Sequence, residues 1–416
     1  MNEGEMSQND VTVLRDLASR VAEIAARDVQ DRRRDLWRRH NSFQPTPPPI
    51  LVLGMPYWGE VFDEATLRCE DPLLRRYERA FWQTLHQDRL QDDSIVEPWF
   101  TVGATFTFPT DSRRWGPEIR TVPSPERRGS WMFDPPLREE SDLDKLVAPH
   151  HAIDEEATAR DFEKISEALG DILPVVVDRG PFWRGWWADL STDIARLRGL
   201  EQFMLDMIDR PRWLHRLLAF MRDGVLAAQE QAEAAGHWRR IHHENQAMPY
   251  ARELSDPAAD DGPVSRRDLW AFFASQETTL VSPAMFEEFM LQYQRPIIEK
   301  FGLSAYGCCE DLTHKIDCLR TIPNLRRISV TAWADVARCA EQIGTDYIFS
   351  WRPSPADMIC TGFKPDKVRR LLRAGLDACR GCHVDITLKD VETIGGNFDD
   401  LIAWVRLARE VAGEYA

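Results

Sequence analysis

The chain has 416 residues, with 68 acidic and 52 basic side chains and a formal net charge of −16. Because binding to nucleic-acid phosphates requires a basic surface, this balance argues against a nucleic-acid partner. The 22 glycines, 26 prolines and 43% hydrophobic residues exclude the collagen-like and disordered classes. The composition is that of a globular protein of enzyme size.

No segment has the pattern of a membrane span or a secretory signal. The longest stretch without a charged side chain, residues 40–59, contains a proline cluster at 45–49 that would break a spanning helix. The N-terminus lacks the basic and apolar regions of a signal peptide, and eight cysteines are too few for a disulfide framework. We therefore expect a cytoplasmic protein that does not enter a membrane.

The first 150 residues are expected to form an extension of helices and strands that packs on the main domain. Apolar residues three or four positions apart predict one long amphipathic helix over 11–37. The pattern then predicts a strand at 50–53, a helix over 72–91, one or two strands within 95–108 and a turn-rich excursion over 109–150.

Residues 151–416 show a regular alternation of strands and helices. Strands are predicted at 173–177, 240–243, 269–273, 304–308, 325–329, 347–350 and 384–388, with helices between them, the first over 155–169. Alternating strands and helices imply a parallel sheet, and so many units favour a (β/α)₈ TIM-type barrel with an N-terminal helical extension. An open doubly wound sheet is the alternative, but no glycine-rich phosphate-binding turn follows any predicted strand.

In a barrel the reactive residues lie at the carboxyl ends of the strands, where the loops form one rim. At or just beyond the predicted strand ends lie Asp178, His242, Glu244, Glu277, Cys308, Glu310, Trp333, Trp351 and Lys389. A rim that served only structure would not require so many ionisable or metal-capable groups. We therefore expect the functional site at this end of the barrel.

The run Cys308–Cys309–Glu310 carries the densest chemistry. A thiolate beside a carboxylate can ligate zinc, which makes Cys308 a candidate metal ligand. Adjacent strand residues point to opposite faces, so only one of the two cysteines can face inward, and a cysteine that merely packs is the alternative. Glu310 is a candidate general acid.

Three further groups are candidate catalytic residues. His242 and His243 alternate on a predicted strand, so at most one of them faces the site, and we expect it to be His242. Asp178 could hold a perturbed pKa in an apolar cavity. Lys389 could bind a carboxylate or orient a substrate oxygen, with a lysine that only caps the barrel end as the alternative.

The 15 tryptophans are unusually many, and clusters of tryptophan line pockets for flat or cationic ligands as well as filling cores. The aromatic run at 182–187 is the tightest such cluster. The candidate substrate-binding residues are Trp183, Trp186, Glu244, Glu277, Trp333 and Trp351.

Several motifs resemble the uroporphyrinogen decarboxylase superfamily. They are YGCCE at 306–310, IPNLRRISVTAWAD at 322–335 and SWRPSP at 350–355, supported by LVSPAMFEEF at 280–289 and LKDVET at 388–393. The similarity is greatest to the decarboxylase-like branch associated with corrinoid-dependent methyltransferases. It covers residues 150–416, and the N-terminal third more loosely, and it implies the same barrel with a helical extension.

The resemblance also bears on a metal site. In zinc-dependent members, a His-x-Cys pair at a strand end and a later cysteine near the last strand hold the metal. This chain has Tyr306 and Cys308 at the positions of the pair and no cysteine after Leu388. The arginine-rich motif for porphyrinogen carboxylates has no counterpart. The resemblance therefore does not decide whether the chain binds zinc, and it argues against decarboxylation of a tetrapyrrole.

The resemblance implies a methyltransferase, the demethylase component of a corrinoid system. It would remove a methyl group from a small methoxylated aromatic compound, by O-demethylation, or from a methylated amine, and pass it to the Co(I) corrinoid of a partner protein. Glu310 or His242 would protonate the leaving group. The alternatives are a cofactor-free decarboxylase, with Asp178 stabilising a protonated intermediate, and a non-catalytic barrel that binds a partner. A homo-oligomer is also left open.

Overall fold

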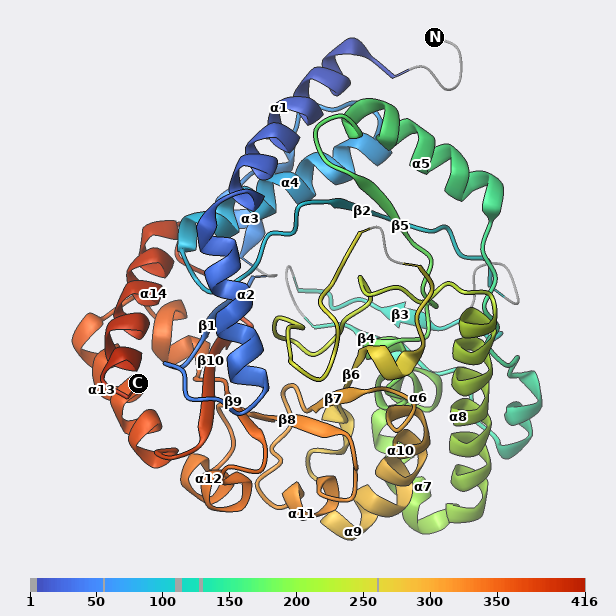
Figure 1. Cartoon of the computed structure of the whole chain (residues 1–416). Helices are drawn as coiled ribbons and strands as arrows, with labels where there is room; N and C mark the ends of the chain where they lie inside the picture. The colour runs from blue at the N-terminus through green and yellow to red at the C-terminus, as the bar shows by residue number, and fades with distance from the viewer. Residues whose placement is uncertain (1–5, 55–56, 109–113, 127–129, 260–261, 416) are drawn as a thin grey trace.

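The computed structural model describes residues 6–54, 57–108, 114–126, 130–259 and 262–415. Its centre is one curved sheet of six parallel strands in the order β1–β10–β9–β8–β7–β6 (Figure 1). The strands are β1 (Ile50–Leu53), β6 (Trp270–Phe273), β7 (Leu303–Tyr306), β8 (Leu325–Val330), β9 (Ile348–Trp351) and β10 (His383–Lys389). Because all six run the same way, their carboxyl ends meet on one side of the sheet.

Two smaller strand pairs accompany this sheet. Strand β2 (Phe100–Gly103) pairs in parallel with β5 (Val175–Asp178), and β3 (Arg120–Val122) forms an antiparallel hairpin with β4 (Met132–Asp134). The α/β class with a parallel sheet is confirmed. The closed eight-stranded barrel is not: within the described ranges, no pairing joins the β2–β5 pair to β1 or to β6.

The break between β5 and β6 has a local cause. Residues 240–243, predicted as a strand, form a turn instead. The backbone N–H of His242 donates to the carbonyl oxygen of Arg239 (3.1 Å), and the N–H of Arg239 donates to Nδ1 of His242 (2.9 Å). These local bonds occupy groups that a strand ladder would use, so the segment does not extend the sheet.

Helices lie around the six-stranded sheet and the β2–β5 pair, as Figure 1 shows. They are α1 (Gln8–Ala25), α2 (Asp28–Asn41), α3 (Trp58–Val61), α4 (Pro72–Leu90), α5 (Glu155–Leu169), α6 (Ser191–Arg198), α7 (Leu200–Asp209), α8 (Pro211–Ala234), α9 (Pro283–Phe286), α10 (Gln292–Ile298), α11 (Ile316–Leu319), α12 (Val336–Ile343), α13 (Pro365–Ala378) and α14 (Phe398–Gly413). Throughout the described ranges, no helix combines the length and the apolar character that crossing a bilayer requires.

The single helix predicted over 11–37 is wrong, because the chain breaks into α1 and α2. Arg27 has an extended backbone (φ −75°, ψ 141°) that ends the helical path between them. The break lets α1 pack against α4, while α2 turns toward the sheet. There Nε1 of the buried Trp37 donates to the carbonyl oxygen of Asp93 (2.7 Å).

A buried ion pair fills the interior toward the amino ends of the strands. Arg327 on β8 donates from Nη2 to Oδ2 of Asp385 on β10 (2.6 Å), and Ser350 on β9 donates to Oδ1 of the same carboxylate (2.8 Å). His40 from α2 contacts Asp385 at 3.2 Å. These polar side chains fill the interior of the sheet at this end.

Candidate active site

Two cysteines and a lysine meet at the carboxyl ends of β7 and β10. Lys389 is the last residue of β10, and Cys308 follows β7 by two residues. Gly307, between the end of β7 and Cys308, turns the chain with a φ of +98°, a value that residues with a side chain rarely adopt. Nζ of Lys389 lies 2.7 Å from Sγ of Cys308 and 3.0 Å from Sγ of Cys309. We call these three residues the thiol–lysine cluster.

The cluster favours a thiolate on Cys308. The hydrogen bond from the Cys309 thiol, together with the charges of Arg352 and Lys389, lowers the pKa of Cys308 to about 6 against the opposing effect of burial. The same hydrogen bond raises the pKa of Cys309, which keeps its proton. Burial lowers the pKa of Lys389, but the neighbouring sulfurs outweigh this and the pKa is raised. These surroundings favour a Cys308 thiolate beside the Lys389 ammonium group.

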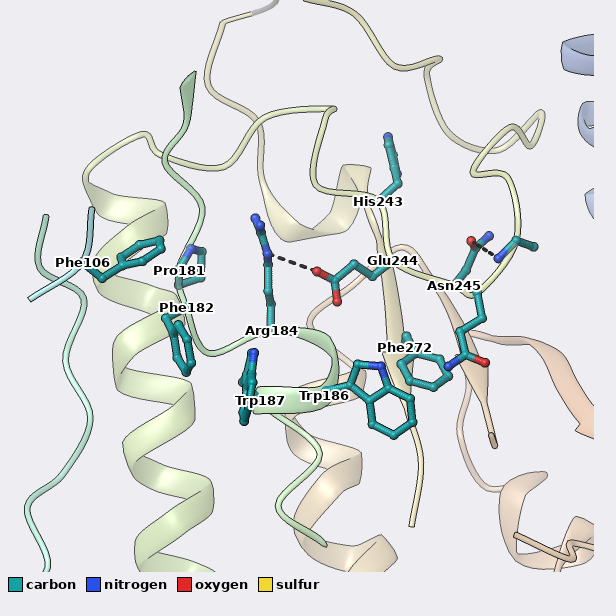
Figure 2. Close-up of a pocket in the computed structure, with 12 residues that line it drawn as sticks. Phe106, Pro181, Phe182, Arg184, Trp186, Trp187, His243, Glu244, Asn245 and Phe272 are labelled. Carbon is teal, nitrogen blue, oxygen red and sulfur yellow. Dashed lines mark hydrogen bonds and ion pairs between the residues drawn. The ribbon is translucent and has the colours of Figure 1, made fainter. Parts of the chain in front are cut away.

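A pocket of about 460 Å³ lies beside this cluster. It is lined by Phe106, Pro181, Phe182, Arg184, Trp186, Trp187, His243, Glu244, Asn245, Gln246, Ala247 and Phe272. Figure 2 shows Trp186 and Phe272 on one side, the rings of Phe106, Phe182 and Trp187 on the other, and Arg184 with Glu244 between them. We call it the aromatic pocket. Its walls suit a flat or cationic ligand.

Gln246 joins the aromatic pocket to the thiol–lysine cluster. Its Nε2 donates to Sγ of Cys308 at 3.5 Å, while its buried Oε1 has no hydrogen-bond partner. Cys308 also packs in one apolar cluster with Phe272 and Trp186, both of which line the pocket. The sulfur therefore lies directly behind the pocket wall.

An ion-pair network organises the polar side of the pocket. Arg184 donates to both carboxylate oxygens of Asp178 (2.9 and 2.5 Å), and its Nε lies 3.1 Å from Oε1 of Glu244 (Figure 2). Burial raises the pKa of Asp178, but Arg184 and His242 outweigh it and the pKa is lowered. Burial raises the pKa of Glu244. Glu244 is thus the acidic group that a ligand in the pocket meets.

Asp178 and His242, which were predicted as an acid and a base, contact each other inside the protein. Nδ1 of His242 accepts from the backbone N–H of Arg239, and its Nε2 contacts Asp178 Oδ1. The His242 side chain is fully buried, and burial lowers its pKa. Sequence reasoning preferred His242, but His243 is the histidine that lines the pocket. Both His243 ring nitrogens are buried without a hydrogen-bond partner.

Glu310 lies at the same end of the sheet but does not face the pocket. It is 2% exposed, and its two oxygens accept from the backbone N–H groups of Ser275 and Cys308, each at 2.8 Å. Both donors lie just beyond the ends of β6 and β7. This is the arrangement of a carboxylate that ties two strand ends together.

The other predicted substrate residues fall into four places. Trp186 lines the aromatic pocket, and Glu277 lines a neighbouring pocket of about 470 Å³ that shares Trp186 with it. Trp183 and Trp351 are buried in the main core. Trp333 is 81% exposed. The sequence did not identify Arg184, Trp187, Gln246 and Phe272 as site residues, although the aromatic run at 182–187 already contained the signal for two of them.

The residues around Cys308 do not fit a zinc site. A zinc ion there would need further nitrogen, sulfur or carboxylate ligands in tetrahedral arrangement. In the part of the chain that the structure describes, no group of three or more His, Cys, Asp or Glu side chains is placed to hold a metal ion. The Lys389 amino group contacts both sulfurs, where a metal ion would have to lie. Its positive charge takes the place of the charge that a metal would bring.

Comparison with known proteins supports the fold. No protein-family model matches the chain, and no curated protein is detectably similar to it. Among solved structures, the chain is similar to a methyltransferase from Methanosarcina mazei, with a TM-score of 0.52 and 15% sequence identity. The similarity covers 92% of this chain and 99% of that one. At this level of identity it shows a shared architecture over nearly the whole length.

Proposed function

We propose that this protein is a methyltransferase of the uroporphyrinogen decarboxylase superfamily, which removes a methyl group from a small molecule held in the aromatic pocket. The observation that carries the proposal is the position of this pocket, at the carboxyl ends of the parallel strands and against a thiolate-bearing cluster. The fold shared with a methyltransferase supports it.

The pocket favours a methylated amine over a methoxylated aromatic compound. Arg114 already lies over the Trp187 ring, 3.9 Å from its centroid, so the rings of Phe106, Trp186 and Phe272 are the ones that would attract a quaternary ammonium group, which has no hydrogen-bond donors. Glu244 adds an acidic group on the same lining, held in place by Arg184 at 3.1 Å. A methoxyarene would fill the same space but, being neutral, would gain no attraction from the Glu244 carboxylate.

The proposed acceptor is the Co(I) corrinoid of a partner protein, which supplies a strong nucleophile for the methyl group. The partner would approach the carboxyl ends of the strands. There Leu280 and Trp333, after β6 and β8, are 86% and 81% exposed, which gives this end an apolar surface. The chain's own task is to bind the donor, exclude water and hold the methyl group in line.

The test is an assay with phenyltrimethylammonium and with methoxybenzene as donors, with and without a reduced corrinoid protein. We expect demethylation of the ammonium donor only when the corrinoid protein is present. Release of CO₂ from carboxylated substrates by the chain alone would contradict the proposal and favour the decarboxylase alternative. A Trp333→Ala variant should keep donor binding and lose rate only at low concentrations of the corrinoid protein.

A further inference from the structure

We propose that Cys308 takes the methyl group from a quaternary ammonium donor onto its own sulfur before the group leaves the protein. The proposed function requires only that a methyl group passes from donor to corrinoid. A covalent step on Cys308 divides this passage into two transfers, from the donor to Cys308 and from Cys308 to the corrinoid. Only the second transfer rests on the proposed function. The first transfer needs no partner.

The first argument is the set of groups that converge on one sulfur. Sγ of Cys308 lies 2.7 Å from Nζ of Lys389, 3.5 Å from Nε2 of Gln246 and 3.5 Å from Sγ of Cys309. All three can donate a hydrogen bond, and none needs to accept one from Cys308. Such an environment stabilises a thiolate, the nucleophilic form of cysteine.

The second argument is the position of Cys308 relative to the aromatic pocket. Gln246 lines the pocket and contacts the sulfur, so one side chain separates the two. Its φ of +51° is unusual for a residue with a side chain, and its buried Oε1 is unpartnered. Rotation of the Gln246 side chain would break its long 3.5 Å contact with Cys308 and no hydrogen bond of Oε1, and it would open the sulfur to a ligand in the pocket.

The third argument is the charge balance of the reaction. A quaternary ammonium is positive and the Cys308 thiolate is negative, so their charges disappear as the methyl group is transferred. Surroundings from which water is excluded favour a step that removes charge, because separated charges are poorly solvated there. The rings of Trp186 and Phe272 beside Cys308 provide such surroundings.

The step balances without an added acid, base or oxidant. The carbon–sulfur bond forms as the carbon–nitrogen bond breaks, the electron pair of that bond stays on nitrogen, and a neutral tertiary amine leaves. When the methyl group passes on to the Co(I) acceptor, the carbon–sulfur bond breaks and its electron pair returns to sulfur. Lys389 at 2.7 Å then stabilises the restored thiolate.

The test uses the wild-type chain without any corrinoid protein. The chain is incubated with phenyltrimethylammonium that carries trideuteriomethyl groups, and its peptides are analysed by mass spectrometry. We expect one trideuteriomethyl group on Cys308 and none on Cys318, a half-buried free cysteine that serves as the internal control. Lys389→Met should slow the labelling at least about 10-fold, because the thiolate loses its counter-charge. Cys318→Ser should label like the wild type.

Donor binding is measured in parallel by calorimetry, so that each outcome either supports or contradicts the inference. An unlabelled Cys308 in protein that binds the donor overturns the inference, and so does failure to bind the donor at all. Corrinoid-dependent turnover at the wild-type rate by a folded Cys308→Ser variant would also overturn it while leaving the proposed function intact. Labelling of Cys308 without corrinoid-dependent turnover would support the inference and contradict the proposed function.

Discussion

The amino group of Lys389 lies 2.7 Å from Sγ of Cys308, although 81 residues separate the two in the chain. Their strands are not neighbours, because β8 and β9 lie between β7 and β10 in the sheet. The contact therefore spans the mouth of the curved sheet. A flat sheet with the same strand order would keep the two side chains apart, so the curvature of the sheet brings the Lys389 ammonium group against the Cys308 sulfur.

The first prediction concerns the ionisation of Cys308. Its pKa of about 6 should appear as the midpoint of the pH dependence of alkylation by iodoacetamide. Lys389→Met removes a positive charge that stabilises the thiolate, so the midpoint should rise by about 1–3 pH units. Lys367→Met, which removes a half-buried lysine paired with Asp357, is the control and should leave the midpoint in place. An unchanged midpoint in Lys389→Met would show that the ammonium does not stabilise the thiolate.

The second prediction concerns the aromatic pocket. Trp186→Ala removes one ring face, and a desolvated cation–π contact is worth about 1–2 kcal/mol. The Kd for phenyltrimethylammonium, measured by calorimetry, should rise about 5- to 30-fold. Trp333→Ala is the matched control, because its ring is 81% exposed and lies outside the pocket lining. Equal effects of the two substitutions would argue against binding in this pocket.

The third prediction separates a structural from a catalytic role of Glu310. Glu310→Gln places an amide N–H against one of two buried backbone donors, so the unfolding free energy should fall by about 1–3 kcal/mol. Chemical denaturation measures this, with the exposed Glu392→Gln as control. The methyl-transfer rate should change only a few-fold. A rate loss of about 10²- to 10⁴-fold with unchanged stability would instead identify Glu310 as the general acid.

The fourth prediction concerns acid stability. Burial, with smaller effects of His242 and Arg240, lowers the pKa of His243 to about 3. Below about pH 6.5 the unfolded chain binds a proton that the folded chain does not, so the unfolding free energy falls as the pH falls from about 6.5 toward 3. His243→Gln should reduce this slope by up to about 1.4 kcal/mol per pH unit.

Urea denaturation at several pH values between neutral and mildly acidic measures this slope. His314→Gln provides the matched control, since His314 is an exposed histidine in a turn. If both variants keep the wild-type slope, His243 is not the buried neutral imidazole that the structure places at the pocket.

Local patterns determined much of the secondary structure. The helix predicted over 155–169 is α5 with the same bounds, and six predicted strands recur as the six-stranded sheet. These elements are predictable because hydrophobic periodicity and short-range propensity act along the chain. The strand predicted at 240–243 does not form, because the His242 side chain accepts a hydrogen bond from the nearby backbone N–H of Arg239. Hydrophobic periodicity does not reveal such a bond.

The sequence by itself also identified which strand ends carry chemistry, since ionisable residues follow almost every strand. Only the tertiary structure decided which of them meet. Curvature of the sheet placed Lys389 against Cys308, while Glu310 and His242 became committed to hydrogen bonds inside the protein. The physical reason is that a residue type fixes what a side chain can do, whereas burial and neighbouring charges from distant segments fix its protonation and its access to a ligand.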